Sequence, residues 1–423
     1  MLAHPLTWIN AATGAADEPC RTPRQEPTMS LRVPSRSLLV VALCTVVPQA
    51  FAQAVGWEFE GHLRLRQEHV EDDAFRPSAD ATTLRLRAGL HGRFGGGWEA
   101  LLEGEGIASA GAFNDGRNGH AGWPVVADPH GVELNQAWLR HAGDRITATA
   151  GRQRLLMGNQ RWIGNSGWRQ NEQTFDAVAL DAQLHASTTL HYAWLGRVHR
   201  VNGDQARDPL ARERRLDSHY AELAWTHGRV QVAPYVLLHR DRDLATASTA
   251  TRGLRGAWNG VRDGHGCRIE ADIARQTEAG DAPLAFSHDY WRIEPACVVR
   301  GTTWRAGVEH LGGDGTHALQ APLGTLHAFN GWADKFNAIP AGGLEDRYLG
   351  AGGKLGRGRA LDWQVAWHDY RADTGGDYGR EWNASLGGAF GTQVKWLAKV
   401  ADYRADGYAR DTRKLWLQLE WTR

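Results

Sequence analysis

Apolar and polar residues alternate along most of the chain from Val55 onward. The segment 57–66, WEFEGHLRLR, sets Trp, Phe and Leu on one phase and Glu, His and Arg on the other. Segments 83–91, 363–367 and 394–400 show the same period of two. Such alternation predicts strands with one apolar and one polar face. The expected strands, of roughly 10 to 14 residues, exceed the ordinary globular length and are typical of tilted strands that cross a bilayer.

The connections between the expected strands alternate in length. Short turns are expected at 95–97, 143–144, 227–228, 300–301, 356–358 and 391–392. Longer loops are expected at 110–130, 158–174, 200–213 and 312–346, with moderate ones near 276–285, 372–378 and 402–411. Short periplasmic turns and long extracellular loops are the pattern of outer-membrane barrels. The sequence therefore predicts an all-β fold, a single transmembrane antiparallel up-and-down β-barrel of about 18 strands.

The tryptophans support this division into two faces. They fall on the apolar phase, several near strand ends, at Trp57, Trp98, Trp291, Trp304, Trp363, Trp367, Trp382, Trp396 and Trp421. Aromatic belts form where barrel strands meet the membrane surfaces. The alternative is a Trp-rich soluble core, which would be unusual in a chain with so few Ile and Met.

The polar phase is expected to line the inside of the barrel. The strand at 57–66 contributes Glu, His and Arg, and the strand at 83–91 contributes Arg85, Arg87 and His91. A polar, hydrated interior is what a channel requires. Most of these charges are expected to pair across strands and to stiffen the wall. Only a subset with unbalanced positive charge is a candidate for function.

The first 52 residues precede the expected barrel and follow a different pattern. Residues 29–52 are typical of a secretory signal peptide, with arginines before a short apolar run and a small-residue cleavage pattern at 50–52. Residues 1–28 have no apolar periodicity and precede a second Met, so we interpret them as a mis-called N-terminal extension. The expected barrel occupies residues 53–423, in the outer membrane of a Gram-negative bacterium.

Charge and motif content exclude several classes of function. The chain has 48 basic and 48 acidic residues, so it lacks the basic excess of a nucleic-acid-binding protein. Nearly all basic residues are Arg, which binds carboxylates through two parallel hydrogen bonds, although genomic base composition alone would explain the bias. The sequence contains no phosphate-binding Gly loop, no nucleophile elbow and no metal-ligand spacing. We therefore expect no catalytic residue, no cofactor and no metal.

One expected loop contains both loop-forming residues and side chains that can bind a solute. Residues 158–174 are rich in Gly, Asn and Gln but also contain Trp and Arg. We expect this loop to hang at the mouth of the barrel, where unpaired Arg in a narrow passage attracts a carboxylated solute. The candidate residues of the passage are Arg152, Arg154, Arg161 and Arg169, with Arg85 and Arg87 on the neighbouring wall.

Two cysteines lie in the expected barrel, which folds in an oxidising compartment. Cys267 and Cys297 both fall on the apolar phase, and they flank the turn near Asp281 symmetrically. They could face each other on adjacent strands and form a disulfide. Alternatively, they could be two small apolar residues in contact with lipid. The sequence leaves both alternatives open.

Three segments carry a family resemblance. The run GNQRWIGNSGWRQNEQTFDAV (158–178) resembles the signature of the alginate-export family of outer-membrane barrels, and segments 321–350 and 133–139 are similar to two others. The resemblance covers essentially all of residues 54–423. It implies an eighteen-stranded monomeric barrel with an Arg-rich constriction, and export of an anionic polysaccharide in the founding member. By position, it implies that the constriction or its gating loops contain Arg152, Arg154, Arg161, Arg169, Asp176 and Lys335.

These observations together predict a passive channel rather than an enzyme. We expect it to conduct an alginate-like anionic polysaccharide or related carboxylated solutes through an Arg-lined lumen. The expected partners are outer-membrane lipids, lipopolysaccharide, the solute itself and a periplasmic scaffold of an export complex. The alternative is an uptake porin for small acids or oligosaccharides, because a passive pore has no intrinsic direction. An outer-membrane enzyme or adhesin ranks below both.

Overall fold

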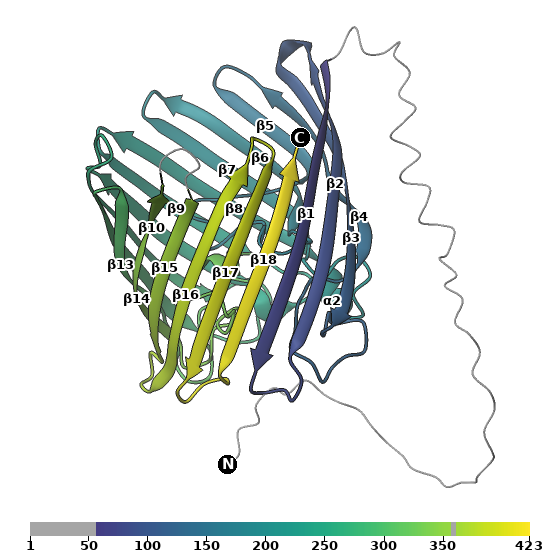
Figure 1. Cartoon of the computed structure of the whole chain (residues 1–423). Coiled ribbons are helices and arrows are strands. Elements are labelled where there is room, and N and C mark those ends of the chain that lie inside the picture. The colour runs from purple at the N-terminus through teal and green to yellow at the C-terminus, as the bar shows by residue number, and fades with distance from the viewer. Residues whose placement is uncertain (1–55, 357–360) are drawn as a thin grey trace, which may run out of the picture. The chain divides into compact units, whose positions relative to one another are not determined.

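A closed antiparallel sheet of 18 strands forms the wall of the molecule (Figure 1). The computed structural model describes residues 56–356 and 361–423. Each strand pairs with the next, and β18 (Thr412–Thr422) pairs with β1 (Gly56–Asp72). This last pairing removes the free edges that the sheet would otherwise expose to hydrocarbon. The expected all-β barrel and its strand number are confirmed, whereas the interpretations of residues 1–28 and 29–52 lie outside the described part.

The remaining strands follow one another in chain order. They are β2 (Ala79–Phe94), β3 (Trp98–Ala112), β4 (Gly131–Ala142), β5 (Ile146–Gln153), β6 (Thr174–His185), β7 (Thr188–His199), β8 (Glu213–His227), β9 (Val230–His239), β10 (Thr249–Asn259), β11 (Gly266–Glu278), β12 (Ser287–Val299), β13 (Thr302–Leu311), β14 (Leu344–Leu355), β15 (Leu361–Arg371), β16 (Asp377–Phe390) and β17 (Val394–Ala405). The helical elements are short: η3 (Gly95–Gly97), α2 (Pro209–Arg212), η4 (Ala245–Ala247) and η5 (Leu326–Ala328). No helix in the described ranges is long and apolar enough to cross a bilayer.

Turns and loops alternate around the barrel as the sequence predicted. The strand bounds also reveal connections that the sequence analysis did not identify. On the side of the long loops these are 73–78 and 240–248, and on the side of the short turns they are 186–187 and 260–265. With them, every strand connection in the described ranges fits a barrel whose short turns are periplasmic and whose long loops are extracellular.

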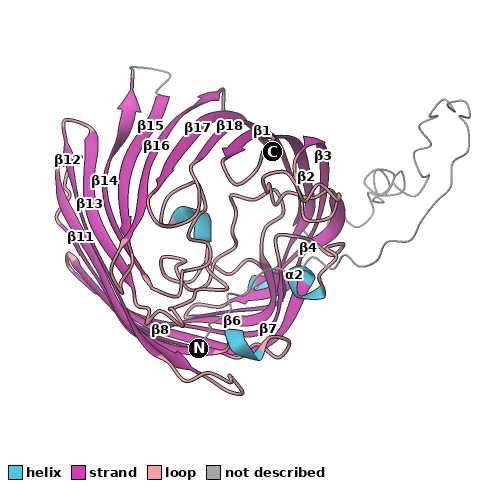
Figure 2. Ribbon diagram, turned by 90° about the horizontal axis from the view of Figure 1, so that it is seen from below, coloured by secondary structure: helices cyan, strands magenta, loops and turns pink. Residues whose placement is uncertain are grey.

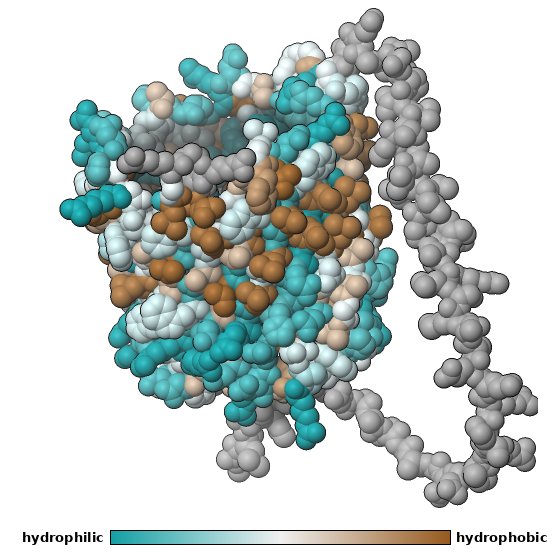
Figure 3. All heavy atoms as spheres, viewed as in Figure 1, coloured by the Kyte–Doolittle hydropathy of each residue, from teal (hydrophilic) through white to brown (hydrophobic). Residues whose placement is uncertain are grey.

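Side chains alternate between the two faces of the wall. On β1, Leu63 and Leu65 point outward and are 36% and 42% exposed, whereas Arg66 and Glu68 on the inner face are each 1% exposed. The same alternation continues on the neighbouring strands, and Figure 3 shows the outward apolar residues as a band between two polar ends. The band matches the hydrocarbon layer of a membrane, and the charged phase faces the interior.

Two long loops fold into the interior of the barrel (Figure 2). We call residues 154–173 the first inward loop and residues 312–343 the second inward loop. Ile163 of the first loop and Phe336 of the second loop belong to one buried apolar cluster, which also contains wall side chains such as Tyr290. We had expected the first loop at the mouth of the barrel. The structure places it deeper, within the lumen. Together the two loops narrow a barrel that would otherwise be wide.

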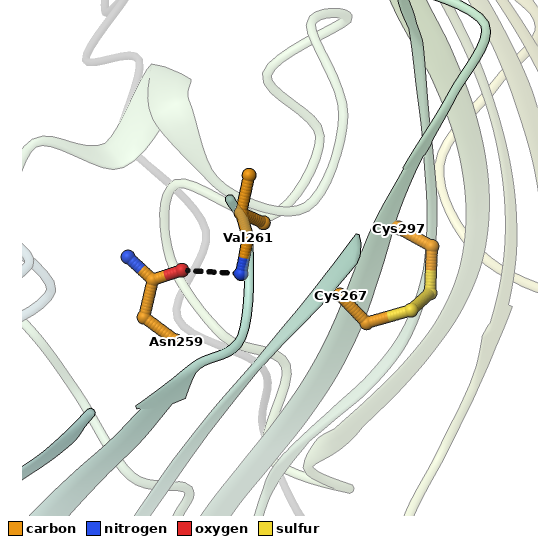
Figure 4. Close-up of a disulfide and its surroundings, with 4 residues drawn as sticks. All are labelled: Asn259, Val261, Cys267 and Cys297. Carbon is orange, nitrogen blue, oxygen red and sulfur yellow. Dashed lines mark hydrogen bonds between the residues drawn. A yellow bond between two sulfur atoms is a disulfide. The ribbon is translucent and has the colours of Figure 1, made fainter. Parts of the chain in front are cut away.

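A disulfide joins two strands on the outer face of the wall (Figure 4). Cys267 on β11 and Cys297 on β12 lie directly opposite each other in the antiparallel register, with a sequence separation of 30. Their neighbours on the same phase, Ile269 and Ile293, are 41% and 46% exposed. The bond therefore lies on the apolar side of the sheet, near its short-turn end.

Thiol labelling tests directly whether the disulfide forms. In protein denatured without reductant, we expect the variants Cys267→Ala and Cys297→Ala each to react with one more equivalent of maleimide than the parent chain does. The reason is that each substitution frees the partner thiol, and intact-mass spectrometry counts the adducts. The double variant Cys267→Ala/Cys297→Ala should label like the parent chain. A parent chain that labels more heavily than either single variant would show that the bond does not form.

Candidate functional site

A row of arginines lines the inner face of β1 and β2. Arg64 on β1 and Arg85 on β2 are direct register partners, and His62 pairs in the same way with Arg87. Like charges directly opposite each other on one face of a sheet are destabilising unless an anion or a dipole lies between them. The inner wall thus concentrates positive charge at this position.

The arginine row holds the first inward loop by its backbone. Guanidinium groups of the wall donate hydrogen bonds to consecutive carbonyl oxygens of the loop. The pairs are Arg64 Nη1 to Gly167 O (3.1 Å) and Arg169 O (3.2 Å), Arg66 Nη2 to Trp168 O (2.6 Å), and Arg85 Nη1 to Gln170 O (3.2 Å). Backbone oxygens carry only partial charge, so these contacts position the loop without neutralising the arginines.

Glu172 ties the first inward loop to the same wall through charge. Its Oε1 accepts from Arg154 Nε at 2.5 Å and from Asn135 Nδ2 at 2.7 Å, and lies 3.2 Å from Arg87 Nη1. Burial alone would raise the pKa of the Glu172 carboxyl, but Arg87 and Arg154 hold this pKa below its ordinary value. Glu172 is therefore ionised at neutral pH, and it pairs with two of the predicted arginines.

Arg85 is the member of the row with the least compensation. Within residues 56–356 and 361–423, no carboxylate oxygen lies within 4.0 Å of its guanidinium, and its Nε has no hydrogen-bond partner. Its Nη2 lies 2.9 Å from Nδ1 of His62. By contrast, Arg64 pairs with Glu420 at 2.5 Å. Arg85 is thus a buried positive charge held by neutral acceptors only.

A cavity of about 770 Å³ lies beside this wall, between β1, β2 and the first inward loop. Its lining includes Arg64, Arg85, Arg87 and Arg154, with glutamates from the same strands and Glu172 from the loop. A volume of this size is within the range of pockets that enclose small-molecule ligands. The predicted residues Arg85, Arg87 and Arg154 are therefore brought together around one open space.

The opposite wall has a different chemistry. Two further cavities, of about 450 and 300 Å³, share Asn159, Glu270 and Arg292 as lining residues. Tyrosine hydroxyls here donate to carboxylates that also bind arginines. The Tyr235 hydroxyl donates to Asp272 at 2.8 Å and the Tyr348 hydroxyl to Glu294 at 2.7 Å. These tyrosines, carboxylates and arginines are paired with one another, which is the stiffening role expected for most lumen charges.

Arg161 fastens the first inward loop to the second. Its Nε lies 3.1 Å from Glu309 Oε1, its Nη2 donates to Asn330 Oδ1 at 3.1 Å, and its guanidinium covers the ring of Phe329 at 4.7 Å. The residue is 1% exposed. Arg161 therefore joins both loops to β13 and does not face the cavity, although the sequence placed it among candidates for the passage.

Asp334 of the second inward loop is the centre of another latch. It binds Arg169 Nη2 at 2.9 Å, Lys414 Nζ at 3.1 Å and His327 Nδ1 at 2.7 Å. Burial alone would raise the pKa of the Asp334 carboxyl, but His327, Lys414 and Arg169 hold this pKa well below its ordinary value. Lys335, next in the chain, binds Asp72 of β1 at 2.7 Å. Arg169 and Lys335 thus act as fasteners between loop and wall.

The imidazole of His327 is held in its neutral form. Its Nδ1 donates to Asp334, and its Nε2 lies 2.7 Å from the Lys399 ammonium, so Nε2 must accept that proton donor. Lys399 also lies 4.0 Å from the ring centroid of Trp168 and 3.8 Å from that of Trp332. Burial lowers the pKa of His327 to about 3; Asp334 acts against this shift, and the nearby Lys399 acts with it.

A glycine allows the second inward loop to reach the wall. Gly331 has a φ of +83°, and a Cβ there would lie 2.2 Å from the Tyr370 hydroxyl. The turn aims the N–H groups of Trp332 and Ala333 at Glu381 Oε1, at 2.5 and 2.9 Å. Any side chain at position 331 would therefore push the loop away from β16.

Arg152 and Asp176 lie on the other side of the wall. They are register partners on β5 and β6, and Arg152 Nε binds Asp176 Oδ1 at 2.9 Å. Their neighbours Phe175 and Ala177 belong to the interior apolar cluster. Because successive side chains of a strand alternate, Arg152 and Asp176 point outward. The structure therefore does not bring these two predicted residues into the constriction.

Sequence reasoning missed the roles of Arg64 and Lys399. Arg64 had been assigned only to the charged phase of its strand. Its pairing with Arg85 follows from counting back along the hairpin from the 73–78 loop, which the sequence analysis did not identify. The contact of Lys399 with the second inward loop depends on strands far apart in sequence, and no local pattern signals it.

Removing the Arg161 latch should loosen both inward loops. Arg161→Gln leaves Glu309 buried without its charge partner, which costs about 3–5 kcal/mol. We expect larger and noisier single-channel conductance in planar bilayers. The double variant Arg161→Gln/Glu309→Gln removes both charges and should return conductance towards the parent value, and Arg262→Gln, in an exposed turn, is the control. A parent-like trace from the single variant would contradict the latch.

Acidification should weaken the contacts of His327. Its folded pKa lies below its unfolded value, so the contribution to stability is complete above about pH 6.5 and is lost as pH falls towards 3. At about pH 5 the loss is about 2 kcal/mol. Hydrogen exchange of residues 325–336, corrected for intrinsic rates, should report this opening. The opening should be reduced in His327→Gln and unchanged in His317→Gln; pH-independent protection in the parent chain would refute it.

Comparison with known proteins identifies the family. Residues 56–279, slightly more than half of the chain, match the family model described as alginate export. No curated protein matches the sequence significantly.

Solved structures resemble the fold. OccK1 (OpdK) of Pseudomonas aeruginosa has a TM-score of 0.66 and 13% identity, over 86% of this chain and 98% of that chain. OccAB2 of Acinetobacter baumannii has a TM-score of 0.64 and 12% identity, over 86% and 98%. Pseudomonas aeruginosa OpdL has a TM-score of 0.63 and 16% identity, over 87% and 99%. At such identities the likeness concerns the fold alone. By its family match and its barrel, the chain belongs to the alginate-export family and is a porin-like channel of the outer membrane of a Gram-negative bacterium.

Proposed function

We propose that this channel conducts carboxylated solutes by passive diffusion, with the arginine row of β1 and β2 as the point of selection. The observation that carries the proposal is the cross-strand pair Arg64–Arg85 beside the 770 Å³ cavity. Arg85 lines this cavity although its side chain is only 1% exposed, and it has no carboxylate within 4.0 Å in the described ranges, so its uncompensated charge attracts a passing anion through the field it sets up in the cavity.

The proposed selection uses attraction that is weak enough to let the solute leave. An Arg guanidinium binds a carboxylate through two parallel hydrogen bonds, and the bonds of Arg85 to the Gln170 carbonyl and to His62, both neutral acceptors, leave its charge available. The glutamates of the same wall compete for the neighbouring arginines, which prevents tight capture of the solute. Conduction requires this balance between entry and release. No covalent step is involved, so the proposed role is not enzymatic.

The size of the cavity favours small acids while the loops stay in place. A single carboxylated ring fits a space of about 770 Å³, whereas an alginate-like polysaccharide requires the two inward loops to move. The family description, alginate export, supports the polymer, and a related crystal structure, Pseudomonas aeruginosa OpdK, was solved with vanillate, which supports small acids. A passive channel carries either solute down its gradient. Export of the polymer would add a periplasmic scaffold as partner.

Ion selectivity tests the proposal directly. Arg85→Gln removes one positive charge from the passage, worth about 1 kcal/mol at ~4 Å from a passing ion in water, so the anion-to-cation permeability ratio should fall roughly fivefold. Zero-current potentials in gradients of potassium chloride and potassium glucuronate measure this ratio. Arg215→Gln removes the same charge from the outer face and should leave it unchanged. A parent channel that prefers cations in both salts would refute the proposal.

A further inference from the structure

A second pair of opposed arginines lies on the outer face of the barrel. Arg252 on β10 and Arg275 on β11 are direct register partners near the long-loop end of their strands. Both side chains are exposed, and they share the outward face of their strands with Leu254 and Ile273, which are 42% and 56% exposed. The two guanidinium groups therefore project from the face that contacts lipid.

The charge of this pair is poorly compensated. Arg275 donates from Nε to Ser287 Oγ at 2.8 Å and lies 3.3 Å from Asp289 Oδ1. In the ranges 56–356 and 361–423, Arg252 has no carboxylate within 4.0 Å and no side-chain hydrogen bond. Its partner on the other neighbouring strand is Val236, which is apolar. Two like charges lie directly opposite each other, and the one carboxylate near them, Asp289, flanks Arg275 on the side away from Arg252, so the pair favours the binding of an additional anion.

The pair lies at the upper limit of the apolar surface. The next row towards the short turns consists of Leu254, Ile273 and Trp291, all outward and exposed. Trp291 stacks on His310, with ring centroids 5.3 Å apart and planes 10° apart. Tryptophan marks the level at which hydrocarbon meets lipid headgroups. Arg252 and Arg275 are therefore at headgroup depth in the outer leaflet, where phosphate groups lie.

We propose that Arg252 and Arg275 bind the phosphate of a phosphorylated glycolipid of the outer leaflet, lipopolysaccharide in a Gram-negative outer membrane. The phosphate offers enough charge and oxygen atoms for two guanidinium forks at once. The acyl chains of the same lipid lie against Leu254 and Ile273, and burial of that apolar surface distinguishes the lipid from free phosphate. Charge complementarity and continuity with the apolar band together select this occupant.

Another outward arginine provides a matched control. Arg347 on β14 also lies near the long-loop end of its strand, but its guanidinium is bound by Glu345, with 2.5 Å between Nη2 and Oε1. An arginine that already has a carboxylate has less to gain from a phosphate. The proposed site thus depends on missing compensation and not on exposure alone.

The affinity of the purified barrel for lipid A tests the proposed site. Delipidated protein in detergent is titrated with diphosphorylated lipid A, and native mass spectrometry counts the complexes. We expect Arg252→Gln/Arg275→Gln to bind roughly tenfold more weakly than the parent, because two charge-assisted contacts are lost. Arg347→Gln should bind like the parent. Asp289→Asn should bind more tightly, since the carboxylate that competes for Arg275 is gone.

Three outcomes would overturn the proposal. They are equal affinity in the double variant, equal affinity for lipid A without phosphates, and binding of inorganic phosphate as tight as that of the lipid. The electrophoretic shift of unheated samples checks that each variant is folded. The zero-current potential of the double variant should match that of the parent, so this inference and the proposed channel selectivity fail independently.

Discussion

Pairing between the last strand and the first is the constraint on which the rest of the structure depends. β18 and β1 run side by side from His62 and Thr422 to Asp72 and Thr412. Without this ladder, both strands would present unpaired N–H and C=O groups to hydrocarbon, where no water can satisfy them. Closure also gives every strand an inside and an outside. Alternate side chains therefore face hydrocarbon outside and the polar lumen inside, and the alternating pattern of the sequence follows from this division.

The same closure creates a problem of charge in the interior. Many arginines and carboxylates of the inner phase are buried against the inward loops and away from water, so they require a polar partner nearby. The inward loops supply many of these partners, with the carbonyls of residues 167–170 on the arginine row and with Asp334 between Arg169 and Lys414. Loop position is thus determined by polar bonds to the wall as much as by the apolar cluster around Ile163. Arg85 also binds the loop, through the carbonyl of Gln170, but unlike Arg161 and Arg169 it has no carboxylate within 4.0 Å in the described part of the chain.

Most of the wall could be predicted from the sequence, and most of the site could not. Alternation over 10 or more residues is a local signal, and it predicted the strands, their faces and their number. The connections at 73–78, 186–187 and 240–248 were missed because they contain no glycine, and the one at 260–265 was missed although it contains Gly260 and Gly264. Arg152 was placed in the passage because it adjoins an arginine-rich loop, but the phase of β5 turns it outward. The partners of Arg161 lie about 150 residues further along the chain, so only the folded barrel brings them together.

Salt in the surrounding medium acts differently on the buried charges of the lumen and on those that line the cavity. Ion pairs such as Arg161–Glu309 are shielded from dissolved salt, so the geometry of the lumen should be the same in fresh water and in brine. The attraction of the cavity arginines for a solute in solution extends about 30 Å at 0.01 M salt but only about 10 Å at 0.1 M. Under the proposed selection for carboxylates, a bacterium in a dilute habitat would therefore gather acidic solutes at this opening from a larger volume than one in the sea, with the same protein and the same pore.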